Sequence, residues 1–96
     1  MKRFEWNSEK NEWLKENRGV SFQDVVELIR LNRTLDTIPH PNTKQHAHQR
    51  VFIVVIAHYV YMVPFVEDEE KVFLKTMYPS RKYTRVYLKK KKGVSV

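Results

Sequence analysis

Residues 51–66 read VFIVVIAHYVYMVPFV and are strongly apolar. Val51 to Ile56 is apolar at every position, which predicts a central strand that helices cover on at least one side. Tyr59 to Val66 is predicted to be its partner across a two-residue turn. The run is too short to span a bilayer, and His58 and Pro64 interrupt it. We therefore expect a hairpin in the middle of a sheet.

Further strands are predicted before and after this hairpin. Phe4 to Trp6 reads as a short edge strand, and Thr34 to Ile38 reads as a second short strand that a proline-rich polar loop follows. After an acidic turn at residues 67–70, a strand is expected from Lys71 to Tyr78. Pro79 ends that strand, because proline cannot donate a hydrogen bond to a sheet.

Helices are predicted at both ends of the chain. Asn7 or Ser8 caps the first, which ends before Gly19, and we expect Trp13 and Leu14 to pack inward from one of its faces. The second opens with a capping-box pattern and buries an apolar stripe, and a third begins at Ser80. The stripe and the box are formed by Ser21, Phe22, Asp24, Val25, Val26 and Ile29.

These elements predict an α+β fold: an antiparallel β-sheet of about four strands with two N-terminal helices and one C-terminal helix packed on it. Residues 1–96 are expected to form a single domain that ends in a basic C-terminal tail, residues 89–96. No signal peptide is visible at the N-terminus, so we expect a cytoplasmic protein with no membrane association.

The positive charge of the chain lies at one end. From Lys71 to Val96 there are nine Lys/Arg and no Asp or Glu, whereas residues 1–70 hold nine basic groups against eleven acidic ones. The formal net charge of +7 therefore comes from the C-terminal segment, where tyrosines alternate with the cations. A one-signed segment of this kind is typical of a surface that binds polyanions.

Two of these cations, Arg81 and Lys82, directly follow the predicted N-cap at Ser80. Cations are unfavourable there by about 0.3–1 kcal/mol each, because the exposed N–H groups already carry partial positive charge. A helix start with added cations is suited to binding phosphate. The alternative is that both side chains point into water.

Lys75 is predicted to be a charge on an otherwise apolar strand face, between Phe73 and Met77. Tyr87 follows in the last helix. Each residue also has a purely structural interpretation: Lys75 can extend its ammonium group to solvent, and Tyr87 can be a core tyrosine. Their expected closeness to Arg81 favours a functional interpretation.

Several classes of site are excluded by the composition. The chain has no cysteine, and its two glycines are too few for a phosphate-binding loop. The four histidines lack the spacing of a zinc site, so we expect no metal and no cofactor. Lys, Arg, Tyr and His remain, and these suffice to cleave RNA when the substrate's 2′-hydroxyl attacks the adjacent phosphate. Crowded cations are expected to lower the pKa of a neighbouring Lys or Tyr.

Several stretches, in this order, resemble the BrnT family of bacterial type II toxins, which have a RelE-like ribonuclease fold. The stretches that carry the resemblance are Phe4-Glu5-Trp6-Asn7 with Lys10, Gly19-Val20-Ser21-Phe22, Arg50 before the apolar strand, and Ser80-Arg81-Lys82 with Thr84. The chain departs from the family at Arg18, where a histidine is usual, at Thr76 or Lys75, where an arginine is usual, and near Tyr87, where a glutamate is usual.

The resemblance implies an endoribonuclease toxin whose partners are cellular RNA and a cognate antitoxin protein. On this hypothesis the catalytic residues are Arg81, Lys75 and Tyr87, and the RNA-binding residues are Arg50, Lys82, Arg85 and Tyr83. The rival hypothesis is a catalytically silent member that binds RNA or a protein through the same surface. The oligomeric state and the RNA sequence preference are left open.

Overall fold

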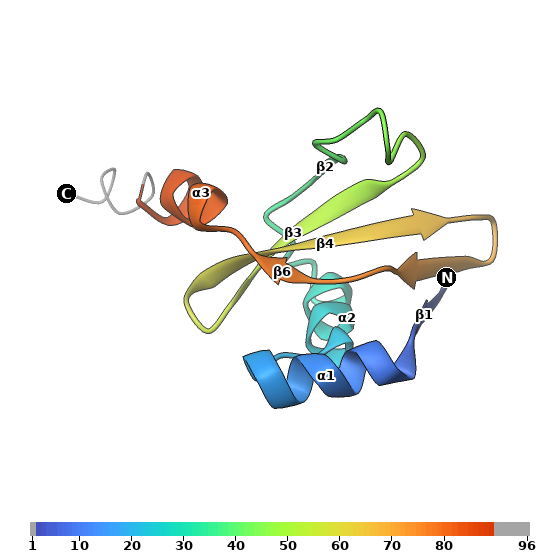
Figure 1. The fold of residues 1–96 in the computed structure, drawn as a ribbon, viewed down its shortest axis with the longest axis horizontal. Helices are drawn as coiled ribbons and strands as arrows, with labels where there is room; N and C mark the ends of the chain where they lie inside the picture. The colour runs from blue at the N-terminus through green and yellow to red at the C-terminus, as the bar shows by residue number, and fades with distance from the viewer. Residues whose placement is uncertain (1, 90–96) are drawn as a thin grey trace.

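The computed structural model of the protein describes residues 2–89 (Figure 1). Along the chain the elements are β1 (Arg3–Trp6), α1 (Ser8–Arg18), α2 (Phe22–Arg30), β2 (Asp36–Pro39), β3 (Arg50–Ile56), β4 (Tyr59–Glu67), β5 (Lys71–Leu74), β6 (Tyr78–Pro79), α3 (Arg81–Thr84) and the π-helical turn η1 (Arg85–Lys89). The predicted α+β class is confirmed. Most of the expected basic tail, residues 90–96, lies outside the described residues.

The sheet has the strand order β1-β5-β4-β3-β2, and β6 pairs with β4 beyond the end of β5. It has more strands than expected and is mixed, because β1 runs parallel to β5. The wholly antiparallel sheet that we predicted is therefore wrong at this edge. Lys71 of β5 places its ammonium 3.8 Å from the Glu5 carboxylate of β1, so opposite charges face each other across the parallel pair.

The predicted central hairpin is β3–β4, which pairs from Arg50–Phe65 to Ile56–Tyr59. Its two turn residues, Ala57 and His58, both have positive φ, 52° and 65°. This is the geometry of the two-residue turns whose twist matches that of the strands. The hairpin is buried on both faces. Val54 and Val63 lie on one face, Ile53 and Val60 lie on the other, and all four are 0% exposed.

The helices divide between the two sides of the sheet. Figure 1 shows α1 and α2 below it, whereas α3 stands above it at the end where β3 turns into β4. The residues of the main core come from α1, α2 and one face of the sheet: Leu14, Val20, Phe22, Val25, Val26, Val54, Tyr61, Val63, Phe65, Val72, Leu74 and Met77.

Helix α1 buries a different face from the one predicted. Leu14 is buried as expected, but Trp13 is 46% exposed and Asn11 is 3% exposed. The Asn11 amide oxygen accepts from the Phe22 backbone N–H at 2.8 Å, and its Nδ2 donates to Gln23 at 2.8 Å. Because α1 must present this asparagine to α2, Trp13 is turned toward solvent.

A bulge divides the strand that we expected over residues 71–78. Phe65 pairs with Leu74 and Met62 pairs with Tyr78, so the three residues 75–77 stand opposite two residues of β4. The bulge lies beside Pro64, which has no N–H to donate, although the Lys75 N–H still donates to the Pro64 carbonyl at 2.8 Å. An extra residue reverses the side-chain alternation. Met77 accordingly joins the core with Leu74, and the predicted apolar face shared by Phe73, Lys75 and Met77 is not formed.

Within residues 2–89, the structure has no helix of the length and apolarity needed to cross a bilayer.

Candidate nucleic-acid interface

Helix α3 is attached to the sheet by a short hydrogen-bond network. Ser80 is the N-cap, as predicted, and its hydroxyl accepts from the Tyr83 N–H at 3.1 Å. The Ser80 N–H donates to the Val60 carbonyl at 2.9 Å, and the Val60 N–H donates to the Thr84 hydroxyl at 2.9 Å. The Thr84 hydroxyl donates in turn to the Ser80 carbonyl at 2.6 Å. The start of α3 therefore has a fixed position against the first residues of β4.

Three cations project from this anchored segment: Arg81, Lys82 and Arg85 are all exposed. Lys82 places its ammonium 5.6 Å from the centre of the Tyr83 ring. None of the three forms an ion pair with a carboxylate of residues 2–89. The ion pairs of that range lie on other elements and join Lys2 and Arg50 to Glu67, Arg3 and Lys71 to Glu5, and Lys15 to Glu12.

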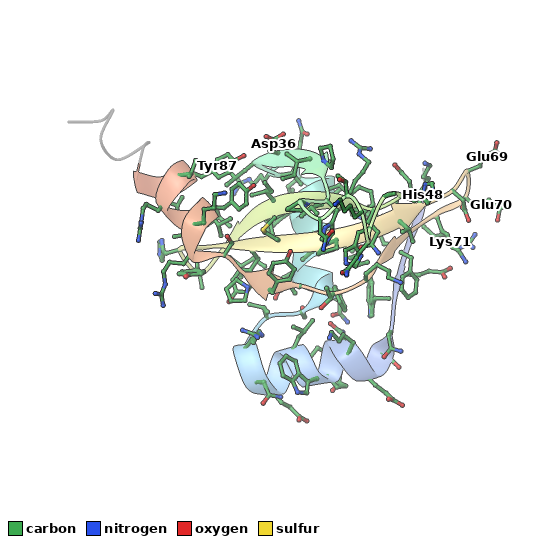
Figure 2. The ribbon with its side chains drawn as sticks, turned by 45° about the horizontal axis from the view of Figure 1, so that its top comes forward. Asp36, His48, Glu69, Glu70, Lys71 and Tyr87 are labelled. Atoms are coloured by element: carbon green, nitrogen blue, oxygen red, sulfur yellow. The ribbon has the colours of Figure 1, made fainter. Side chains whose placement is uncertain are left out.

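Tyr87 lies in the same helical segment and donates its hydroxyl hydrogen to the Asp36 carboxylate at 3.2 Å (Figure 2). Partial burial raises the pKa of Tyr87, and the Asp36 charge and hydrogen bond raise it further. The expectation that crowded cations lower the pKa of a tyrosine is therefore wrong for Tyr87. Its phenol stays protonated at neutral pH and can donate a proton rather than take one.

Asp36 is a site residue that the sequence analysis missed. It is the first residue of β2, and nothing in its local sequence relates it to a helix 51 residues further along the chain. The edge position of β2 beside β3 brings the two together, and no spacing pattern encodes that contact.

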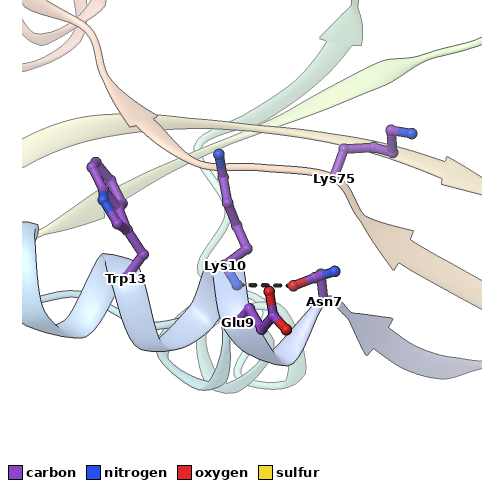
Figure 3. A pocket seen from close by; sticks show the side chains of 5 residues that line it. All are labelled: Asn7, Glu9, Lys10, Trp13 and Lys75. Atoms are coloured by element: carbon purple, nitrogen blue, oxygen red, sulfur yellow. Dashed lines mark hydrogen bonds between the residues drawn. The ribbon is translucent and has the colours of Figure 1, made fainter.

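Lys75 lies in the bulge and lines a hollow of about 470 Å³ with Asn7, Glu9, Lys10 and Trp13 of the α1 region (Figure 3). Arg81 and Tyr87 do not line this hollow. The Lys75 N–H bonds to Pro64 and the Ser80 N–H bonds to Val60, so the two backbones are four residues apart along β4. At about 3.3 Å per strand residue this is roughly 13 Å.

Arg50, which we expected to bind RNA with the others, lies at the opposite end of the sheet from α3. It is paired with Phe65 in the ladder and stands six residues from Ile56, which is roughly 20 Å along the strand. Its guanidinium lies 3.4 Å from the Glu67 carboxylate. The structure thus gathers in one segment the side chains of Arg81, Lys82, Tyr83, Arg85 and Tyr87. Lys75 lines a separate hollow, so its expected closeness to Arg81 is not observed. Arg50 is separated from both.

The loop between β2 and β3 holds two histidines in contact. The His40 and His46 ring centres are 4.1 Å apart, and His40 Nδ1 accepts from the Asn42 N–H at 3.0 Å. Burial lowers the pKa of His40, and the adjacent His46 lowers it further. In the part of the chain that the structure describes, no three His, Asp or Glu side chains are grouped to hold a metal ion.

Comparisons of the chain with protein-family models, with curated proteins and with solved structures find no match.

Proposed function

We propose that this protein is an endoribonuclease toxin of a type II toxin–antitoxin system and that it cleaves RNA without a metal ion. The single observation that carries the proposal is the anchored helical segment 81–89, whose exposed Arg81, Lys82 and Arg85 have no carboxylate partner within residues 2–89. Fixed, unneutralised cations next to tyrosine rings are suited to a single-stranded polyanion.

The reaction is an internal displacement at phosphorus. The 2′-oxygen of the substrate attacks the adjacent phosphate, a base takes the 2′-hydroxyl proton, and the 5′-oxygen leaves with a proton from an acid. The products are a 2′,3′-cyclic phosphate and a 5′-hydroxyl. Negative charge grows on the phosphate oxygens in the transition state, so the protein accelerates the reaction by placing cations and a proton donor around them.

In this proposal Arg81 binds the scissile phosphate and stabilises its developing charge. Tyr87, whose phenol is protonated at neutral pH, gives its proton to the leaving 5′-oxygen. Lys75 lines a hollow apart from Arg81 and Tyr87, so it contacts the RNA strand away from the scissile phosphate. Lys82, Arg85 and Tyr83 hold the neighbouring nucleotides.

The test is cleavage of RNA by the purified protein in EDTA, compared with two charge-matched variants. Removing a donor that acts on transition-state charge costs roughly 100–1,000-fold in rate, and we expect a loss of this size for Arg81→Ala. Arg30→Ala removes an exposed arginine of α2, on the other side of the sheet from α3, and should cleave at the wild-type rate. Undiminished cleavage by a folded Arg81→Ala variant would contradict the assignment.

A second candidate is a catalytically silent module that binds RNA or a protein through the same surface. The observation that favours it is that Lys75 lines a hollow bounded by α1, apart from Arg81 and Tyr87. Salt-sensitive RNA binding with no cleavage would support this candidate.

The antitoxin is expected to cover the basic segment with acidic and apolar side chains. Val86, which is 46% exposed among the cations, offers an apolar contact for it. A neighbouring reading frame that encodes a small acidic or ribbon-helix-helix-like protein would support the toxin assignment.

A further inference from the structure

Helix α1 presents an exposed tryptophan between two cations. Trp13 is 46% exposed, its ring centre lies 5.8 Å from the Lys10 ammonium, and it lies 5.4 Å from the Arg18 guanidinium carbon. The packing of α1 on α2 through Asn11 and Leu14 explains why Trp13 is outside the core. It does not explain why so large an aromatic side chain occupies the exposed position.

The ring of Trp13 borders the hollow that Lys75 lines. Figure 3 shows Trp13 and Lys10 rising from α1 toward the β5–β6 connection, where Lys75 lies. The volume of about 470 Å³ is within the range of small-ligand pockets. The hollow is open to solvent, so a ligand can enter it as part of a longer chain.

The side chains around the hollow indicate the chemistry of its ligand. Lys10 and Lys75 supply two positive charges, Glu9 is the one carboxylate among the lining residues, and Asn7 supplies an amide. The Asn7 side-chain oxygen already accepts from the Lys10 backbone N–H at 2.9 Å. An aromatic face beside ammonium groups is the combination that binds unpaired nucleotides, because bases stack on the ring and phosphates contact the cations.

We propose that this hollow binds one unpaired nucleotide of an RNA strand, with its base stacked on Trp13 and its phosphates contacted by Lys10 and Lys75. The inference rests on the proposed function, since the same strand continues from Lys75 along the bulge to Arg81. The backbone separation of roughly 13 Å along β4 means that one strand would meet the hollow and Arg81 through different nucleotides.

Tryptophan fluorescence tests the stacking directly. Trp6 packs against Phe22, with ring centres 5.9 Å apart, so a Trp6→Phe variant keeps an aromatic ring there and leaves Trp13 as the one reporter. The ligand is a short 2′-O-methyl RNA, which cannot undergo internal attack. We expect its addition to quench the fluorescence in a saturable, salt-sensitive manner. Absence of quenching by an oligonucleotide that binds the protein would overturn the proposal.

Matched variants distinguish the contributions of the Trp13 ring and the Lys10 charge from a general loss of apolar surface or of net charge. Trp13→Leu should weaken binding of the 2′-O-methyl RNA roughly tenfold, whereas Trp13→Phe should retain most of the affinity. Lys10→Ala should weaken binding more than Lys15→Ala, which removes an equal charge from the same helix outside the hollow. Equal affinities for Trp13→Leu and Trp13→Phe would count against a stacked base.

The outcomes distinguish this inference from the proposed function. Quenching by the RNA in a protein that does not cleave would support nucleotide binding in the hollow and contradict the proposed ribonuclease activity. Cleavage that is sensitive to Arg81→Ala, with no quenching, would contradict nucleotide binding in the hollow and still support the proposed ribonuclease activity. Quenching by an acidic peptide but not by RNA would show that the hollow takes a protein partner and would overturn the inference.

Discussion

At the scale of single residues, the charge and hydrogen bond of Asp36 add to the rise in the pKa of Tyr87 that burial causes. Asp36→Asn removes the charge that raises the pKa of Tyr87 but keeps a side chain of similar size. We expect the Tyr87 phenol to ionise at a lower pH in this variant, as measured by NMR titration of its ring. Tyr87→Phe identifies the resonance. An unchanged or higher pKa would contradict the role assigned to Asp36.

The raised pKa of Tyr87 also makes the free energy of unfolding depend on pH. Because the folded-state pKa is raised, the stabilising effect is complete below the ordinary tyrosine pKa of about 10 and is lost as the pH rises through the folded-state value. Ionisation of Tyr87 therefore destabilises the fold only in strongly alkaline solution, and stability in the neutral range is unaffected by it.

At the scale of elements, Thr84 holds α3 on the sheet. Its hydroxyl accepts from Val60, which is fully buried, so Thr84→Val leaves that N–H without its acceptor. We expect the free energy of unfolding to fall by about 1–3 kcal/mol, as measured by urea denaturation. Thr84→Ser keeps the hydroxyl and should lose less. Equal losses for the two variants would show that the hydrogen bonds are not what anchors α3.

The bulge at residues 75–77 shows why element positions were easier to predict than side-chain directions. Apolar periodicity located the β3–β4 hairpin and both N-terminal helices. The caps at Ser21 and Ser80 were identified from local sequence, and the first cap was narrowed to Asn7 or Ser8, of which Asn7 is the cap. The direction of Lys75 depends on one extra residue opposite Pro64, which is a property of the strand pair. Alternation within one strand could not reveal it.

The positions of Trp13 and Asp36 also depend on contacts between distant segments, which local sequence does not reveal. Spacing predicts which residues share a helical face. In α1, however, Asn11 is buried and Trp13 is exposed, because the Asn11 amide accepts a hydrogen bond from the α2 backbone. Asp36 meets Tyr87 through sheet order, which the chain determines only when all strands are paired.

At the scale of the whole molecule, the exposed cations of α3 and the acidic β4–β5 turn lie at opposite ends of the sheet. Arg81, Lys82 and Arg85 lie at the α3 end, and Figure 2 shows Glu69 and Glu70 at the opposite end, in the β4–β5 turn. For the proposed RNA ligand, this arrangement favours approach toward α3, with a strong dependence on ionic strength. Arg50 lies at the far end of the sheet from α3, beside the Glu67 carboxylate that it shares with Lys2, and is expected to contribute little to RNA affinity.

The salt dependence of RNA binding gives a quantitative prediction. A cation that contacts a single-strand phosphate contributes roughly 0.7 to the slope of log affinity against log salt concentration. Lys82→Ala should reduce the magnitude of the slope by about this amount, as measured by fluorescence anisotropy of a labelled oligonucleotide. Arg50→Ala serves as the matched control and should leave the slope nearly unchanged. Equal slope changes for both variants would contradict the placement of the interface on α3.

The stability of the molecule should also depend on pH through the loop after β2. The pKa of His40 is lowered in the folded state by burial and by His46, so the unfolded chain binds a proton more readily. The stabilising effect is present above about pH 6.5 and is lost as the pH falls through the folded-state pKa. Urea midpoints measured from about pH 7.5 to 5 should fall, and less so in His40→Asn, which cannot titrate. A slope that His40→Asn leaves unchanged would contradict this origin.

The identity of the RNA ends after cleavage tests the central claim most directly. Incubation of a defined RNA with the purified protein in EDTA, followed by mass spectrometry, should yield fragments with 2′,3′-cyclic phosphates and 5′-hydroxyls. The same RNA with a single 2′-deoxy nucleotide at the cleaved position should remain intact there. Fragments with 5′-phosphates, or an RNA that binds the protein but is never cut, would contradict the account.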